Sequence, residues 1–356
     1  MLKATGSEIL DFSNTPTVIS QWRLFFIPNG VGMAKSDNLR AANRAKNDEF
    51  YTAYDDIQKE LINYARHFKN KVIYCNCDDH NGIGLGTPKS NFLKYLADNF
   101  QAFGIKKVIA THYESGKRST MYILDKDNTG DGFICSEDIS EIPLRGDGDF
   151  RSEECGELLK LADIVITNPP FSLFREYVAQ LIEYKKKFLI IGNKNAISFK
   201  EIFPLIRDNK IWLGYGSPCN FITGDGVPTK QVNGLTRWYT NLEHNKRNEF
   251  LDTGKKYYGF ENMYPKYINY EAINVDKTSD IPMDYDGVMG VPITFLDKYN
   301  PEQFEIIGHS LELANMDIIK QKQGKVGGGP RFYLETDDGT LKRLYERIVI
   351  RKKKDN

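Results

Sequence analysis

The chain has 356 residues, 40% of them apolar, so it can bury the core of an ordinary catalytic domain and of a smaller second unit. Lysine and arginine balance aspartate and glutamate at 48 each, which excludes a uniformly basic surface and requires any nucleic-acid-binding face to be local. The five cysteines form no paired Cys-x-x-Cys set, which excludes a small disulfide-rich secreted domain and favours reduced thiols in the cytoplasm.

The N-terminal segment, residues 1–32, differs from the rest of the chain. It carries Glu8 and Asp11 and has no long apolar block, so it is unlike a signal peptide. The sequence from Met33 reads like a second beginning, and we expect residues 1–32 to be an extension outside the fold. No segment of the chain approaches the roughly 20 apolar residues of a membrane-spanning helix.

Five short apolar runs rich in β-branched residues predict buried strands. The clearest helix is predicted over residues 172–184, where apolar side chains recur at i, i+3 and i+4 and Ser172 is the expected N-cap. Near-continuous apolar strands that alternate with helices predict an α/β fold with a doubly wound, mostly parallel sheet, whose ligands bind at the carboxyl ends of the strands. The predicted strands cover residues 71–75, 107–111, 163–167, 188–192 and 211–214.

Two segments imitate metal sites. Residues 127–138 have the acid and glycine spacing of a calcium loop, but Asp138 stands where the bidentate glutamate belongs. Residues 121–124 and 133–135 resemble strands and not the helices that flank a calcium loop. We interpret them as a hairpin with a polar turn. Cys75 and Cys77 have no companion pair for zinc, so we expect no metal.

The pattern becomes less regular after about residue 215, where aromatic residues, glycine and asparagine dominate. Residues 281–307 and 347–354 hold the most regular sequence of this part. We expect one domain over residues 33–245 and a smaller region over residues 246–356.

The sequence Asn168-Pro169-Pro170-Phe171 directly follows a predicted strand and directly precedes the predicted helix. The amine of a base such as adenine is a poor nucleophile, because its lone pair is delocalised into the ring. Two acceptors, the Asn168 side-chain oxygen and the Pro169 carbonyl, can bind its two protons as the nitrogen turns tetrahedral. The prolines stiffen the loop, and Phe171 offers a face for a base that has left the duplex. An ordinary turn is the alternative, and the flanking strand and helix weigh against it.

The chain resembles the EcoRI-type adenine-N6 DNA methyltransferases, from about Asn47 to Ile307 with gaps. This resemblance implies a Rossmann-like methyltransferase sheet, S-adenosyl-L-methionine as the cofactor and duplex DNA as the substrate. Residues 33–245 would then be the catalytic domain and residues 246–356 the target-recognition region. The matching segments comprise residues 48–52, 74–79, 146–152, 167–177, 187–191 and 287–295.

The resemblance also implies where the cofactor binds. It places Phe50, Tyr51 and Thr52 against the amino-acid end of the cofactor. Asp149 would accept from its adenine amine and Phe150 would stack on the ring, although Asp149 could equally be a solvated loop carboxylate. For Glu114, proposed to bind the ribose, the solvated carboxylate is the favoured interpretation.

The end of the first strand carries Cys75, Asn76 and Asp78 where most methyltransferases have a glycine-rich loop, and we expect Asp78 near the methionine end. The glycines of residues 82–86 come too late after the strand, and we interpret them as an inserted surface loop.

DNA binding requires cationic and aromatic groups in the second half of the chain. Trp238 is the expected aromatic contact to the flipped base, and Cys219 is interpreted as a loop thiol. Solvated surface charge is the alternative for each cation. The proposed cationic contacts are Lys246, Arg247, Lys255, Lys256, Lys266 and Arg331.

Two other functions remain open. One is methylation of a protein glutamine by a similar Asn-Pro-Pro loop. Phe171 weighs against it, because the enzymes of that family usually have tyrosine after the prolines. The absent glycine-rich loop would suit a DNA-binding relative that has lost catalysis. For the methyltransferase we expect a monomer or weak dimer, and a cognate restriction endonuclease that shares the target sequence without forming a stable complex.

Overall fold

The computed structural model describes residues 50–78, 90–223, 228–229, 234–324 and 328–354. The expected extension, residues 1–32, and the glycine-rich residues 82–86 lie outside this part of the chain. No helix among the described residues is long and apolar enough to span a bilayer.

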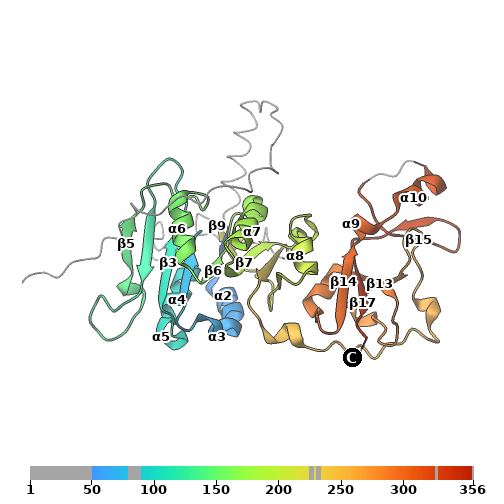
Figure 1. Ribbon diagram of the computed structural model, residues 1–356, viewed down its shortest axis with the longest axis horizontal. Helices are drawn as coiled ribbons and strands as arrows, with labels where there is room; N and C mark the ends of the chain where they lie inside the picture. The colour runs from blue at the N-terminus through green and yellow to red at the C-terminus, as the bar shows by residue number, and fades with distance from the viewer. Residues whose placement is uncertain (1–49, 79–89, 224–227, 230–233, 325–327, 355–356) are drawn as a thin grey trace, which may run out of the picture. The chain divides into compact units, whose positions relative to one another are not determined.

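The central sheet has eight strands in the order β5-β4-β3-β2-β6-β7-β11-β8 (Figure 1). The four middle strands, β3-β2-β6-β7, are parallel, which confirms the predicted parallel sheet. The strands β4, β5 and the inserted β11 are antiparallel to their neighbours. The bounds are β2 (Val72–Cys75), β3 (Lys107–Thr111), β4 (Thr120–Leu124), β5 (Ser140–Pro143), β6 (Ile164–Thr167), β7 (Lys187–Asn193), β8 (Trp212–Leu213) and β11 (Thr236–Thr240).

Helices cover both faces of the central sheet. Side chains along each strand therefore alternate between two apolar cores, one on each face. In β6, Val165 belongs to one core, whereas Ile164 and Ile166 belong to the other. The first core includes side chains of α6, α7 and α8, and the second includes side chains of α2, α4 and α5, so the sheet is doubly wound. The helices are α2 (Tyr54–Leu61), α3 (Ala65–Phe68), α4 (Asn91–Asp98), α5 (Phe100–Phe103), α6 (Glu153–Leu161), α7 (Phe174–Glu183) and α8 (Phe203–Arg207), with 3-10 turns η1 (Ile62–Tyr64), η2 (Ser136–Asp138), η3 (Phe171–Leu173) and η4 (Lys194–Ser198).

The segment that imitates a calcium loop connects β4 and β5, which confirms the predicted hairpin. The second strand of the hairpin begins at Ser140. Residues 133–135, which we expected to be a strand, belong to the connection between the two strands. Asp127 accepts from the backbone amides of Gly130 and Gly132, and Asp138 accepts from those of Asn128, Thr129 and Cys135. The two carboxylates therefore stabilise the turn itself.

A second sheet, β12-β13-β17-β14, forms most of the C-terminal part. Three of its strands lie within residues 281–307 and 347–354 or overlap them, as the regular sequence there predicted. Its buried residues continue the core of α6 and α7, since Met289, Phe304 and Ile350 belong to the same apolar cluster as Val178. The elements are β12 (Ile273–Asn274), β13 (Val288–Pro292), β14 (Phe304–His309), β15 (Tyr333–Glu335), β16 (Leu341–Arg343), β17 (Arg347–Lys352), α9 (Ser310–Leu313), α10 (Met316–Gln323), η5 (Asn245–Asn248), η6 (Glu261–Met263), η7 (Thr278–Asp280) and η8 (Ile293–Lys298).

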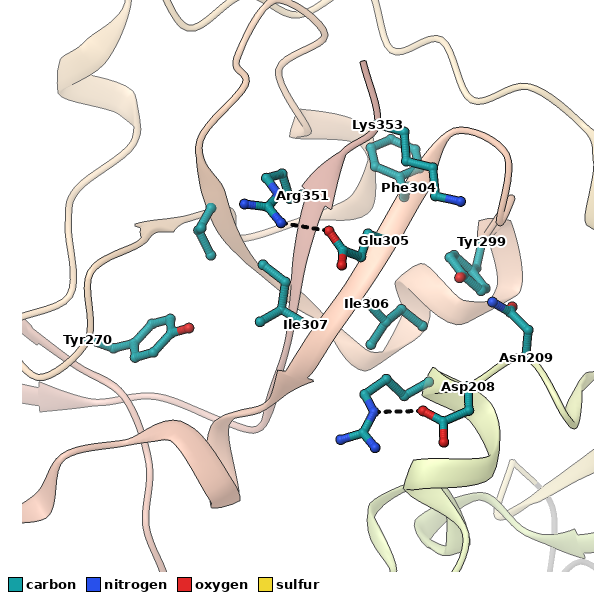
Figure 2. Close-up of a pocket in the computed structure, with 12 residues that line it drawn as sticks. Asp208, Asn209, Tyr270, Tyr299, Phe304, Glu305, Ile306, Ile307, Arg351 and Lys353 are labelled. Atoms are coloured by element: carbon teal, nitrogen blue, oxygen red, sulfur yellow. Dashed lines mark hydrogen bonds and ion pairs between the residues drawn. The ribbon is translucent and has the colours of Figure 1, made fainter. Parts of the chain in front are cut away.

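A cavity of about 700 Å³ lies along β14, between the end of α8 and β17 (Figure 2). Two ion pairs lie at its wall: Arg351 with Glu305 at 2.8 Å and Arg207 with Asp208 at 2.9 Å. None of the residues predicted to bind the cofactor or to act in catalysis lines this cavity.

Candidate active site

Asn168, Pro169 and Pro170 follow β6 at its carboxyl end, as the sequence predicted. Phe171 begins a 3-10 turn, and α7 starts only at Phe174. Ser172 is therefore not the N-cap, because it lies inside that turn and Leu173 precedes the helix without a side-chain cap. The Leu173 amide donates to the Pro170 carbonyl at 3.0 Å, which joins the loop to the helix.

The side chain of Asn168 is oriented by a residue far away in sequence. Its Nδ2 donates to the Thr52 hydroxyl at 3.4 Å, so the amide oxygen is the end that Thr52 does not engage. Thr52 is buried in β1 (Phe50–Thr52), which pairs with β9 (Phe221–Thr223) in a small sheet completed by β10 (Pro228–Thr229). Pro169 is buried, and Phe171 is half-buried against the core of α2 and α4. The structure thus joins the predicted catalytic loop to the predicted cofactor segment.

Asp78 connects the ends of three parallel strands. The Thr167 hydroxyl donates to its Oδ2 at 2.8 Å and the Ser90 hydroxyl to its Oδ1 at 2.5 Å. Its backbone amide donates to Thr111 at the end of β3. Because Asp78 is buried and Thr167 directly precedes Asn168, the carboxylate fixes the strand end from which the catalytic loop departs.

The two residues before Cys77 are both buried. The Cys75 side chain is fully buried in the core of α2 and α4, and burial raises the pKa of its thiol well above the usual value. Any contact of Cys75 with the cofactor would therefore come from its backbone, and its place in the cofactor site stays a prediction. Asn76 is also buried, but the Tyr177 hydroxyl donates to its Oδ1, and no residue in the described part of the chain accepts a hydrogen bond from its Nδ2.

The segment around Asp149 lies across the end of β3. The Glu114 amide donates to the Asp147 carbonyl at 2.8 Å, and Glu114 Oε1 lies 3.0 Å from His112 Nε2. Gly148 has a φ of +79°, and a Cβ there would lie 1.9 Å from the His112 carbonyl oxygen, so only glycine fits. The close approach brings Glu114 and Asp149, both predicted for the cofactor, to the same sheet edge.

Asp149 and Phe150 already have partners within the chain. Arg151 donates to Asp149 at 2.6 Å, and this hydrogen bond lowers the pKa of Asp149 below its usual value. Phe150 is only 6% exposed: its ring packs edge-on against Tyr177, and the Arg151 guanidinium lies 5.4 Å from its centroid. This packing contradicts the prediction that Phe150 stacks on the adenine ring of the cofactor, because the Phe150 ring is part of the core.

Sequence analysis missed two buried carboxylates of α2. Asp56 accepts from the backbone amides of Cys219 and Asn220, and Glu60 accepts from those of Tyr215 and Gly216. Together they hold the segment that leads into β9, the strand that pairs with Thr52 and its neighbours. The available signal was their spacing, since the two acids lie four residues apart, each directly before a buried apolar residue of the same helix.

Two of the predicted DNA contacts are buried. Trp238 is 1% exposed in β11 and packs against Phe92, so it has no free face for a flipped base. Arg247 lies 3.8 Å above the Trp212 ring and donates to Asn209, and its prediction as a DNA contact is wrong for the same reason.

The other predicted cations differ in exposure. Lys246 donates to the Tyr215 carbonyl at 2.6 Å, and Arg331 donates to Glu346 at 2.7 Å, so both support the fold. Lys255, Lys256 and Lys266 are exposed, and Lys266 has an exposed partner, Glu271, at 3.3 Å. Only these three lysines remain as accessible cationic contacts from the predicted set.

In the described residues, no group of three or more histidine, cysteine, aspartate or glutamate side chains could hold a metal ion. The site instead consists of amide, hydroxyl and carboxylate groups around the ends of β2, β3 and β6.

Comparisons with known proteins cover most of the chain. A family model described as "Adenine-specific methyltransferase EcoRI" matches residues 38–353. The type II methyltransferase M.EcoRI of Escherichia coli is 49% identical over 298 residues, which cover 76% of this chain and 88% of the relative.

Two mycoplasma proteins are also similar. M.MpnI of Mycoplasma pneumoniae is 36% identical over 336 residues, covering 88% of this chain and 97% of the relative. M.MgeORF184P of Mycoplasma genitalium is 35% identical over 339 residues, covering 88% and 98%. Both are named type II methyltransferases. No solved structure matches the chain.

Proposed function

The chain belongs to the EcoRI family of adenine-specific methyltransferases, and from this premise we propose that it methylates N6 of a flipped-out adenine in duplex DNA with S-adenosylmethionine. The observation that carries the proposal is the position of Asn168 and the two prolines at the carboxyl end of β6, next to the buried Thr52. In a doubly wound sheet this edge is where ligands bind.

The catalytic loop supplies hydrogen-bond acceptors. The Asn168 amide oxygen and the Pro169 carbonyl would each accept one proton of the adenine amine, and this favours the tetrahedral nitrogen that attacks the methyl carbon. With the cofactor bound, the new N–C bond would form as the C–S bond breaks, and one amine proton would be released to water. Phe171, which is half-buried and directly follows Pro170, would pack against the extruded base.

The polar groups near the loop fit the proposed cofactor. S-adenosylmethionine, when bound, supplies an electrophilic methyl group on a sulfonium ion. Asn76 offers a buried amide donor that has no acceptor among the described residues, and Glu114 and Asp149 bring carboxylates to the neighbouring strand end. Tyr51, Thr52 and Asp78 complete the set that we propose around the methionine end, while Phe50 would contribute through the same β1 strand.

The C-terminal part would recognise the target sequence, with Lys255, Lys256 and Lys266 as accessible cations for the phosphate backbone. As its relatives are named type II methyltransferases, we propose that the chain protects DNA against a restriction endonuclease of the same specificity. The two enzymes would share a sequence and need no stable complex.

The direct test is product analysis. The purified chain is incubated with methyl-labelled S-adenosylmethionine and unmethylated duplex DNA, which is then digested to nucleosides. We expect label in N6-methyladenine, and a decrease of at least about 100-fold for Asn168→Ala, because that variant loses one acceptor at the reacting nitrogen.

Two results would contradict the proposal. DNA binding without any labelled nucleoside would indicate a DNA-binding protein that has lost catalysis. Label in protein glutamine, with parallel DNA samples unlabelled, would indicate an amide methyltransferase that uses a similar loop.

A further inference from the structure

One face of α7 contacts both segments that we expect to bind the cofactor. The Tyr177 hydroxyl donates to Asn76 Oδ1 at the end of β2, and the Tyr177 ring packs edge-on against Phe150 with centroids 5.1 Å apart. One turn further along, Gln180 Nε2 donates to the Phe150 carbonyl at 3.0 Å. Side chains three residues apart lie on the same helix face, so α7 can bind both segments at once.

The hydrogen bond from Tyr177 determines which way the Asn76 amide faces. Burial raises the pKa of Tyr177 well above its usual value, so its hydroxyl stays protonated and donates. An amide has one oxygen and one amino group, and engaging the oxygen fixes the amino group on the opposite side. Asn76 is only 2% exposed, and its Nδ2 has no acceptor in the described part of the chain. A buried donor of this kind calls for an acceptor that the described residues do not supply.

On the basis of the proposed function, we propose that Tyr177 and Gln180 are positioning residues for S-adenosylmethionine. Tyr177 orients the Asn76 amide so that its amino group donates to an oxygen of the cofactor, and Gln180 fixes the backbone of the Asp149–Phe150 segment. Neither side chain needs to touch the cofactor. Because α7 follows the catalytic loop after one 3-10 turn, the same helix holds the methyl donor in register with Asn168.

The experiment measures binding of S-adenosylhomocysteine, the demethylated product of the cofactor, to the DNA-free chain by titration calorimetry. Tyr177→Phe keeps the packed ring and removes only the hydroxyl. We expect it to raise the Kd five- to tenfold and to raise the KM for the cofactor similarly, while kcat at saturating cofactor changes less than twofold. Gln180→Met, which cannot donate to the Phe150 carbonyl, should raise the Kd two- to fivefold.

A matched control separates positioning from general loss of packing. Tyr267 also donates its buried hydroxyl to an asparagine oxygen, that of Asn274, at 2.9 Å in the C-terminal part. We expect Tyr267→Phe to leave the Kd unchanged. In an Asn76→Ala background, adding Tyr177→Phe should change the Kd less than twofold, because the hydroxyl acts through the amide that is already gone.

Each outcome distinguishes the inference from the function on which it rests. Normal binding by a folded Tyr177→Phe variant, or full additivity with Asn76→Ala, would overturn the positioning role and leave the proposed methyl transfer intact. Absence of any binding by the unaltered chain would overturn the cofactor assignment and the positioning role together.

Discussion

The hydroxyl of Thr52 links the amide of Asn168 to a strand 116 residues earlier in the chain. Thr52→Val keeps the shape of the side chain but removes this acceptor, so Asn168 would adopt several orientations. We expect kcat to decrease about three- to tenfold, the range of one net hydrogen bond. Single-turnover kinetics with duplex DNA measure the effect.

A threonine of the central sheet supplies the control. Thr240, in β11, donates its hydroxyl to the Phe188 carbonyl in β7 and has no hydrogen bond to the catalytic loop among the described residues. Thr240→Val should therefore reduce stability without a specific effect on kcat. Equal losses of kcat in the two variants would argue against a role for Thr52 in orienting Asn168.

The buried carboxyl of Glu60 predicts an unusual pH dependence of stability. Burial raises its pKa from 4.5 to about 7, and hydrogen bonds from Tyr215, Gly216 and Tyr64 only partly oppose this. A raised pKa means that the folded state favours the protonated form. The contribution is complete below pH 4.5 and is lost as the pH rises through about 7, an effect of up to about 3 kcal/mol.

Urea unfolding between pH 5 and about pH 8 tests the Glu60 prediction. We expect Glu60→Gln to abolish the decline in unfolding free energy that Glu60 contributes over this interval, whereas the exposed Glu183→Gln should keep the slope of the parent chain. Identical slopes for the parent and Glu60→Gln would show that the carboxyl stays ionised in the folded state.

The position of a single residue was predictable from sequence when it depends on neighbours along the chain. Asn168 belongs to such a local pattern. Glu60 does not, because it accepts from amides 155 and 156 residues later, and nothing near it in sequence indicates those partners. Trp238 was wrongly assigned to the flipped base. It is buried because β11 pairs with β7, and the sequence does not indicate this pairing.

Among the elements, the parallel strands were predictable because burial on both faces gives each strand an almost continuous apolar run. The placement of β11 between β7 and β8 was not, since sequence order gives no sign that a later strand pairs between two earlier ones. The same is true of β1 and β9, which are short and pair across 170 residues, so no local periodicity marks them.

The connection across the end of β3 depends on one glycine. Gly148→Ala would require both a strained positive φ and displacement of the His112 carbonyl. Gly130 has the same φ of +79° with open space around it, so Gly130→Ala isolates the backbone strain, about 1 kcal/mol. We expect Gly148→Ala to cost at least about 2 kcal/mol more, measured by urea unfolding. Equal costs for the two variants would contradict the close packing of this connection.

A polar cluster connects the region after β7 of the central sheet with the sheet β12-β13-β17-β14. Glu346, at the start of β17, accepts from Ser198 after β7 and from Arg331, and it lies 3.6 Å from His309. The nearby His309, followed by the Ser198 hydroxyl and the charge of Arg331, lowers the pKa of Glu346 from 4.5 to about 2 against the opposing effect of burial. This contribution to stability is present above pH 4.5 and is lost as the pH falls towards 2.

Glu346→Gln tests this junction. We expect the free energy of unfolding at pH 7 to decrease by about 1–3 kcal/mol, because charged partners are left with a neutral amide. The variant should also lose less of its free energy of unfolding than the parent chain as the pH falls from 4.5 towards 2. Glu305→Gln, which removes an exposed ion pair with Arg351, is the matched control and should change stability by less than about 1 kcal/mol. Similar losses for both variants would count against the junction.

On the proposed assignment of target recognition to the C-terminal part, the apolar cluster that runs from α6 and α7 into β13, β14 and β17 has a consequence for how specificity can evolve. A recognition module joined by a flexible linker can be exchanged between relatives as a unit, but here exchange would cut through a common interior and expose it to water. New target sequences must therefore arise by substitution of surface residues while the shared interior is kept. A lineage built on this plan would diversify gradually, one base contact at a time, and not by shuffling whole parts.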